Sequence, residues 1–285
     1  MNKVYNTVWN ESTGMWVVTS ELTRKGGRRP RQIRRTALAG MIAGLLLPSA
    51  PALAVGYNNE TLGSGGTSSS MSVSAGDTAT DTTINRGGYQ NVSSGGSATS
   101  TTINSGGYQY VSGGGSATST TINRGGFQNV SSGGSATSTT INSGGSQYVS
   151  SGGSATSTTI NSGGSQYVSS GGSATSTIVN SRGYQTVYSG GSATSTTINS
   201  GGHLGVSGGG TAVDITQNSG GAISANTSAA LSGTNINGNF SIANGSASNM
   251  LLENGGSLSV LNGHQATDTT INSGGYQYVS SGGSA

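Results

Sequence analysis

The chain has 285 residues, of which 52 are glycine and only 7% are charged, whereas ordinary globular domains carry about 25% charged residues. Eight of its eleven Lys and Arg residues precede residue 36, so residues 55–285 hold three Arg residues against six acidic ones. That balance excludes a nucleic-acid-binding protein, which needs a basic stripe. The chain has no Cys, so its stability has to come from backbone pairing and packing instead of disulfides.

Residues 1–54 are typical of an extended signal peptide read by the Sec machinery. A basic stretch at 24–35 precedes an apolar run at 37–47, and small residues follow at Ala52 and Ala54. We expect signal peptidase to cut between Ala54 and Val55. A transmembrane anchor is disfavoured, because about 11 apolar residues fall short of the roughly 20 that cross a bilayer. Two Arg pairs raise the twin-arginine route, but the apolar residues that usually flank such a pair are missing.

A repeat of 19 residues begins near residue 73. One aliphatic residue recurs in phase over seven units, and a valine recurs in phase over eight. A flexible Gly/Ser linker has no reason to keep such a phase, so we predict a repetitive fold. The first series consists of Ile84, Ile103, Ile122, Ile141, Ile160, Val179 and Ile198, and the second of Val73, Val92, Val111, Val130, Val149, Val168, Val187 and Val206.

Each unit contains two Gly pairs, such as Gly95-Gly96 and Gly106-Gly107, and they predict corners because glycine adopts positive φ. Between corners lie 97–105 and 108–112, which are rich in strand formers. Ordering a unit costs roughly 1–2 kcal/mol per residue, while burying one Ile or Val returns only about 1.5–3 kcal/mol, so units must stack on one another. We therefore predict an all-β fold, a right-handed parallel β-helix of about eleven rungs spaced ~4.8 Å apart.

The segments of the chain follow from this pattern. We expect the signal peptide at 1–54, an N-terminal cap at 55–77, regular repeats at 78–210, and irregular but continuing coils at 211–285. Gln217 stands where the Ile series would continue, and the repeat returns at 269–281. Because the chain stops in mid-unit at Ala285, we expect it to be the truncated N-terminal part of a longer protein.

Strand alternation predicts which side chains face inward. In the second strand we expect Val111 inside, Gln109 in a stacked amide ladder, and the variable positions outside. In the first strand we expect Ile103, Thr101 and Thr99 inside, with Ser100 and Thr102 outward. The equivalents of Ser100 include Asp81 and Asp268, and a charge is acceptable only outside. We also expect Asn104 and its equivalents to form an Asn ladder beside a corner.

The export segment at 1–54, the SSGGSATSTTINSGG units and the stretch at 218–256 together resemble self-associating autotransporter adhesins, namely the diffuse-adherence adhesin, antigen 43 and the TibA-like adhesins. The resemblance implies that the chain is an N-terminal passenger fragment displayed on the outer-membrane surface. Such passengers mediate adhesion, autoaggregation and biofilm formation. The implied partners are another copy of the passenger, the host-cell surface, the Sec machinery and a cytoplasmic heptosyltransferase that modifies Ser and Thr.

We expect this heptosyltransferase to act on outward hydroxyls of the units. The candidate glycosylation sites are Ser100, Thr102, Ser105, Ser119, Thr121, Ser143 and Ser162. No catalytic residue, cofactor or metal site is predicted, because the six acidic residues are scattered and the Gly pairs lack the Asp of a calcium-binding β-roll. We interpret His203 and His264 as surface substitutions, one at a Tyr position and one in a loop.

Two other functions stay open. A secreted carbohydrate-active β-helix would need clustered carboxylates, which this sequence lacks. An inert or ice-binding solenoid is suggested by Thr99 and Thr101, provided that both face outward on a flat surface, whereas we expect both inside.

Overall fold

The computed structural model describes residues 5–10, 15–20 and 53–285, and the chain divides into two units, Met1–Pro51 and Ala52–Ala285. Across the described residues, every regular element is a strand, and none is a helix able to span a membrane. In the first unit, β1 (Tyr5–Asn10) pairs antiparallel with β2 (Met15–Ser20) and sets Trp9 opposite Trp16. The basic and apolar stretches of the signal lie outside the described residues.

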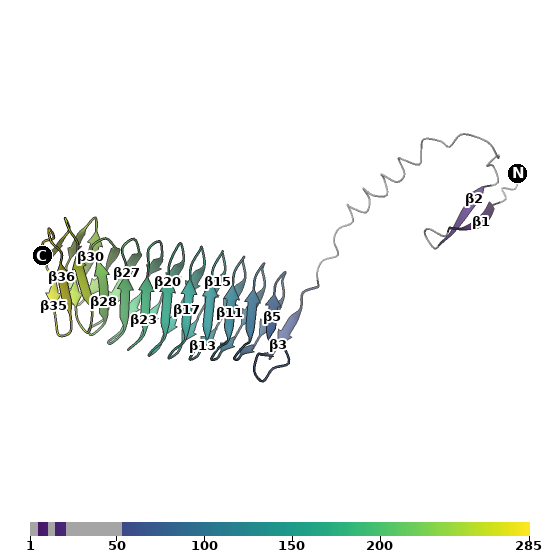
Figure 1. Ribbon diagram of the computed structural model, residues 1–285, viewed down its shortest axis with the longest axis horizontal. Coiled ribbons are helices and arrows are strands. Elements are labelled where there is room, and N and C mark those ends of the chain that lie inside the picture. The colour runs from purple at the N-terminus through teal and green to yellow at the C-terminus, as the bar shows by residue number, and fades with distance from the viewer. Residues whose placement is uncertain (1–4, 11–14, 21–52) are drawn as a thin grey trace. The chain divides into compact units, whose positions relative to one another are not determined.

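The second unit is a parallel β-solenoid in which one coil stacks on the next (Figure 1). A regular coil contributes three strands, for example β9 (Ser97–Thr99), β10 (Thr102–Ile103) and β11 (Tyr108–Val111). Each strand pairs in parallel with the residues 19 positions on, as Ile103 does with Ile122. This arrangement confirms the all-β, parallel β-helix of 19-residue coils.

The strands of the second unit fall into three sheets. The eleven-stranded sheet consists of β5 (Ser70–Val73), β8 (Tyr89–Val92), β11, β14 (Phe127–Val130), β17 (Ser146–Val149), β20 (Ser165–Val168), β23 (Tyr184–Val187), β26 (His203–Val206), β28 (Ala222–Asn226), β33 (Ser257–Val260) and β36 (Tyr276–Val279). The 21-stranded sheet consists of β3 (Gly56–Asn58), β4 (Thr61–Leu62), β6 (Thr78–Thr80), β7 (Thr83–Ile84), β9, β10, β12 (Ser116–Thr118), β13 (Thr121–Ile122), β15 (Ser135–Thr137), β16 (Thr140–Ile141), β18 (Ser154–Thr156), β19 (Thr159–Ile160), β21 (Ser173–Thr175), β22 (Ile178–Val179), β24 (Ser192–Thr194), β25 (Thr197–Ile198), β27 (Thr211–Gln217), β29 (Ala230–Asn235), β30 (Gly238–Ala243), β31 (Ser246–Ser248) and β34 (Gln265–Thr267). A two-stranded sheet joins β32 (Leu251–Leu252) to β35 (Thr270–Ile271).

The recurring aliphatic residues form the core. Every member of the Ile series and every member of the Val series is buried, as predicted. A third buried column, represented by Ala98, comes from the strands equivalent to β9. Alanine is small enough to let the opposite walls of the coil approach each other there.

Two polar ladders run along the coils. In the interior, the amide of Gln109 donates to Gln90 Oε1 at 2.8 Å, and the equivalent bonds continue to Gln185. At a corner, Asn104 Nδ2 donates to Asn85 Oδ1 at 2.9 Å, and the equivalent bonds continue to Asn218. Both predicted ladders are confirmed. Buried amides are acceptable in this core because each finds a partner one coil away.

A third corner changes the predicted face of one residue. Ser100 has a φ of 57°, and this left-handed residue separates β9 from β10. Alternation restarts after it, so Thr101 is buried while Thr99 is exposed. The prediction that Thr99 faces inward is therefore wrong, because strict alternation holds only along an uninterrupted strand. The predicted outward positions of Ser100, Asp81 and Asp268 are confirmed.

The two glycines of a pair have different tasks. Gly106 has a φ of 71° within the turn closed by the bond from Gly107 N to Asn104 O, and this conformation disfavours larger residues. Gly107 packs against the preceding coil, since a Cβ there would lie 2.5 Å from Ile84 O. The first glycine shapes the corner, and the second allows the coils to stack.

The coils continue beyond residue 210. Gln217 pairs with Ile198, at the position where the Ile series would continue. It is buried, and its Nε2 donates to the carbonyls of Gly221 and Leu251. The chain then makes an antiparallel excursion, β29–β30–β31, before β33 pairs in parallel with β28.

Candidate functional site

The corner at Ser100 carries a column of outward hydroxyls. The amide of Ser100 donates to Thr118 O at 2.9 Å, and the amide of Ser119 donates to Thr137 O at 2.9 Å. These bonds hold successive corners in register along the coils. Both serines are exposed and have a φ of 57°, so their side chains point away from the stacked backbone.

The next corner carries a second column, which contains Ser105, Ser143 and Ser162, all of them exposed. Beside Ser105 and Ser143 lies a glycine of the following coil, whereas Arg182 stands at the equivalent position after Ser162. A Cβ placed on Gly125 would lie 3.0 Å from Ser105 Oγ, and one placed on Gly163 would lie 2.8 Å from Ser143 Oγ. Because glycine has no Cβ, the space next to the hydroxyls of Ser105 and Ser143 stays open.

The two threonine candidates differ from the serines. Thr102 and Thr121 are half-buried, and they pair with each other in the 21-stranded sheet. Their side chains face outward, as predicted, but neighbouring rungs flank them closely. The structure thus places all seven candidate acceptors on the surface, with the five serines at corners and the two threonines within strands.

A further serine column, which the sequence analysis did not single out, lies at the corner after the eleven-stranded sheet. Ser94, Ser132, Ser151 and Ser170 are exposed there, each with a positive φ. Two successive positive φ angles, at Ser94 and Gly95, are typical of a type I′ turn. The recurring Ser-Ser-Gly-Gly motif is the sequence signal that could have located this column.

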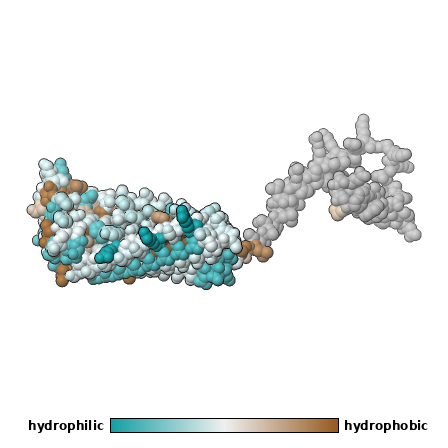
Figure 2. Space-filling model, turned by 60° about the horizontal axis from the view of Figure 1, so that its bottom comes forward, coloured by the Kyte–Doolittle hydropathy of each residue, from teal (hydrophilic) through white to brown (hydrophobic). Residues whose placement is uncertain are grey.

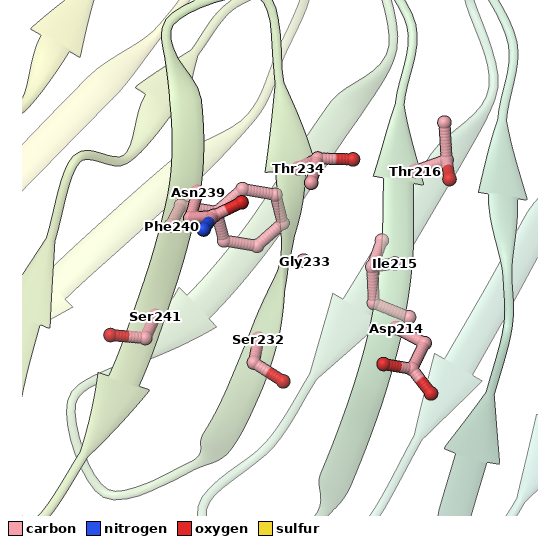
Figure 3. A pocket seen from close by; sticks show the side chains of 9 residues that line it. All are labelled: Asp214, Ile215, Thr216, Ser232, Gly233, Thr234, Asn239, Phe240 and Ser241. Carbon is pink, nitrogen blue, oxygen red and sulfur yellow. The ribbon is translucent and has the colours of Figure 1, made fainter.

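A polar hollow of about 490 Å³ lies where the regular coils end (Figure 3). Asp214 and Thr216 of β27 and Thr234 of β29 line it, with Asn239 of β30 beside them. Phe240 faces the core instead and is buried. Asp214 is the one acidic residue in the lining, whereas glycoside hydrolysis requires two carboxyl groups.

The two histidines make local contacts. His203 pairs with Tyr184 of the preceding rung, so it occupies a Tyr position, as we interpreted it from the sequence. The Nε2 atom of His203 lies 2.9 Å from Ser224 Oγ. Burial lowers the pKa of His203, since desolvation penalises the charged ring. His264 Nδ1 lies 2.8 Å from the hydroxyl of Thr227, which is buried. Both histidines are half-buried instead of fully on the surface.

Val55, the predicted first residue of the exported chain, has a specific partner. Its backbone N lies 2.7 Å from Asp77 Oδ1, while Asp77 Oδ2 accepts the Ser74 amide at 3.1 Å. Ala54 and Val55 are exposed, so the predicted cleavage bond lies at the surface next to this carboxylate.

Known protein families match most of the chain. A family described as adhesin of bacterial autotransporter system, probable stalk, matches residues 58–107, 104–164, 146–202 and 232–285. The chain belongs to this autotransporter adhesin stalk family. The extended signal peptide family of type V secretion matches residues 1–50, so the autotransporter passenger is exported to the cell surface or the extracellular space.

Three relatives show how far the similarity reaches. Autotransporter CRAC of Citrobacter rodentium is 72% identical over 266 residues, which are 93% of this chain and 13% of CRAC. Autotransporter adhesin/invasin TibA of Escherichia coli is 77% identical over 90 residues, which are 32% of this chain and 9% of TibA. The crystal structure of a hyperglycosylated TibA fragment, modified by TibC, matches with a TM-score of 0.60 at 48% identity and covers 81% of this chain and 96% of the fragment.

Most of this autotransporter stalk is polar. The side seen in Figure 2 is largely hydrophilic or neutral, and hydrophobic residues gather at the C-terminal end of the solenoid. The chain spans only a small part of the length of CRAC and TibA. Its stalk therefore corresponds to one section of each of these relatives.

Proposed function

We propose that this stalk mediates cell adhesion through contacts between passengers on neighbouring cells, which leads to autoaggregation and biofilm formation, and that it also attaches bacteria to the host-cell surface. The regular columns of outward hydroxyls support this proposal. Each hydrogen bond contributes about 0.5–1.5 kcal/mol, and stacked coils repeat the same donors and acceptors along one face. Many weak contacts, summed along two rods, are enough to join cells.

Cells that display the passenger are expected to settle faster than cells of the same strain that lack it. Fluorescent cells that display the passenger are mixed either with unlabelled cells that also display it or with unlabelled cells that lack it. The comparison distinguishes contacts between two passengers from contacts between a passenger and another part of the cell surface. Incorporation of displaying cells alone into aggregates supports contacts between passengers. Equal incorporation of bare cells, or settling no faster than the bare strain, counts against the proposal.

We further propose that a cytoplasmic heptosyltransferase modifies the corner serines. The hyperglycosylation of the TibA fragment by TibC supports this idea, as does the open space beside Ser105 and Ser143. In the folded, exported chain, Ser100, Ser105, Ser119, Ser143 and Ser162 are expected to carry more sugar than Thr102 and Thr121, because a sugar on a half-buried threonine would disturb the packing of the neighbouring rungs. Buried Thr101, whose hydroxyl bonds to Gln90 at 3.4 Å, is expected to stay unmodified.

Peptide mapping by mass spectrometry tests this order of modification. The peptides of the exported chain are compared between cells that have the transferase and cells that lack it. Two single variants, Ser105→Ala and Ser143→Ala, are expressed in separate strains, so that each serves as the control for the other. Loss of one heptose from only the mutated peptide supports the assignment. An unmodified chain, or sugar on Thr101 in the folded protein, contradicts it.

We infer that the Sec machinery exports the chain and that cleavage follows Ala54. Cleavage there would turn the N of Val55 into an ammonium group beside Asp77, and the 2.7 Å contact would become an ion pair. N-terminal sequencing of the exported protein is expected to begin at Val55, and a start at any other residue contradicts the assignment.

The enzymatic alternative has little support, since the relatives are named as an autotransporter or adhesin and the hollow beside β27 is lined by a single acidic residue, Asp214. A structural or ice-binding solenoid would need both Thr99 and Thr101 outward, but only Thr99 is exposed and Thr101 is buried. Family membership favours the adhesin over that alternative.

A further inference from the structure

The outer face of the eleven-stranded sheet carries aromatic side chains in two columns. One column contains Tyr89, Tyr108 and Phe127, and the other contains Asn91, Tyr110, Asn129, Tyr148 and Tyr167 in that order. Two pairs of rings on successive rungs stack on each other. The ring centroids lie 5.0 Å apart for Tyr148 and Tyr167, and 5.3 Å apart for Tyr108 and Phe127.

An asparagine interrupts the second column on each side of Tyr110. The surface is hollow at both interruptions. A hollow of about 180 Å³ lies at Asn129 and reaches Tyr110 and Tyr148, and one of about 400 Å³ lies at Asn91 and reaches Tyr89 and Tyr110. The hollows occur because a short amide replaces a ring in the stack, so aromatic side chains of neighbouring rungs remain on either side.

The floor of the smaller hollow holds an unused polar atom. Asn129 Oδ1 is covered and has no hydrogen-bond partner among the described residues, which leaves a polar group in need of one. A rotation of the Asn129 side chain would present the amide to a ligand in the hollow. The residues that line the two hollows are aromatic, amide or glycine residues, and none is charged.

We propose that the two hollows beside Tyr110 are subsites for a neutral oligosaccharide. A sugar ring has C–H bonds on its faces and hydroxyls around its rim. The faces match the electron-rich faces of tyrosine rings, and the hydroxyls match the donors and acceptors of an Asn amide. Pockets of this kind, mostly apolar with a few polar groups, are typical of small-ligand sites.

The size and spacing of the hollows favour a chain of sugars over a lone small molecule. The hollow at Asn129 has roughly the volume that six waters take up in the liquid, which suits one ring. Asn91 and Asn129 lie two rungs apart, roughly 10 Å along the solenoid. A glycan that runs along the rod repeats its rings in this direction and can place one on each side of Tyr110.

Variants that the repeat itself supplies can test the site without disturbing the fold. Tyr110→Thr copies the residue at Thr186 and removes the ring shared by both hollows. Asn129→Tyr copies Tyr148 and fills the smaller hollow with a stacked ring. Ser165→Tyr is the matched control, since it recreates the Tyr-Gln-Tyr-Val strand of β11 away from both hollows.

Binding is measured by calorimetry and by tyrosine fluorescence on the exported full chain, with cellohexaose and chitohexaose as neutral probes and a heparin hexasaccharide as the charged comparison. Both Trp residues lie in the signal segment, so tyrosine dominates the emission of the processed protein. Saturable binding of a neutral probe is expected, weakened at least about tenfold by Tyr110→Thr and by Asn129→Tyr and unchanged in Ser165→Tyr. Equal thermal midpoints show that the variants fold.

Three results would overturn the proposal. They are no saturable binding of either neutral probe to the unmutated chain, equal binding by all variants, and tighter binding of heparin that Tyr110→Thr does not alter. If Tyr110→Thr abolishes cell clumping while no sugar binds, the outer face of the eleven-stranded sheet contacts a second copy of the passenger instead of a glycan. The sugar site does not rest on homotypic adhesion, so a failure of one leaves the other standing.

Discussion

The amide of Gln128 donates a 2.6 Å hydrogen bond to Oε1 of Gln109, its equivalent one coil earlier. Both side chains are completely buried, and the hydroxyl of Thr120 donates to the same Gln109 oxygen at 3.3 Å. Each coil therefore depends on its neighbour to satisfy a polar group in the core. This coupling specifies the register of the stack, because a shift between coils would leave amides unpaired.

Replacing Gln128 with Leu is expected to destabilise the solenoid. Leucine fills similar space but removes the ladder bonds to Gln109 Oε1 and from Gln147 Nε2, at about 0.5–1.5 kcal/mol for each lost hydrogen bond. Thr120 and Thr139 still bond to these two atoms. Urea unfolding followed by circular dichroism measures the loss. Phe127→Tyr, a change at the half-buried outward position next to it, is the control and is expected to stay within about 0.5 kcal/mol. A Gln128→Leu protein as stable as the parent would contradict the role given to the ladder.

Glycines at two different corners should respond differently to a side chain. Gly107→Ala puts a Cβ 2.5 Å from Ile84 O, and the coils would have to separate, which costs at least about 1–3 kcal/mol. Gly113→Ser instead copies Ser94 at the same corner and has open space, with the nearest atom 3.8 Å away. Its expected effect lies within about 0.5 kcal/mol. The thermal unfolding midpoints of the two variants test this difference. Equal midpoints would show that a side chain at Gly107 does not hinder the stacking of the coils.

The first coil should depend on Asp77. Once the chain is cleaved, Asp77→Asn is expected to weaken the contact with the terminal ammonium of Val55 by up to about 1 kcal/mol, since the pair is exposed to solvent. The loss should shrink in high salt, which screens exposed charges. Hydrogen exchange of residues 55–80 provides the readout. Asp81→Asn, a change at an exposed corner, serves as control, and the same exchange in both variants would argue against the ion pair.

Acid should destabilise the solenoid around His203. Burial lowers the pKa of His203 from 6.5 in the folded chain, so below that pH the unfolded chain binds more protons than the folded one. Stability is therefore lost as the pH falls below about 6.5, and this residue contributes no pH dependence above it. His203→Tyr, which copies Tyr184, should remove this part of the decline. Thermal midpoints of both proteins between about pH 7 and pH 5 test the sign, and parallel curves would refute it.

Much of the fold could be predicted from the sequence, because near-identical units place equivalent residues next to each other in successive coils. The 19-residue period alone specifies the buried Ile103 and Val111 columns, the Gln and Asn ladders and the parallel stacking. The tertiary structure decided the rest. Ser100 takes a left-handed conformation that turns Thr99 outward, and the alternation of Tyr110 with Asn129 becomes a pair of hollows only when coils lie side by side. These features depend on where the backbone bends and on contacts between residues 19 or more apart, which a local pattern does not contain.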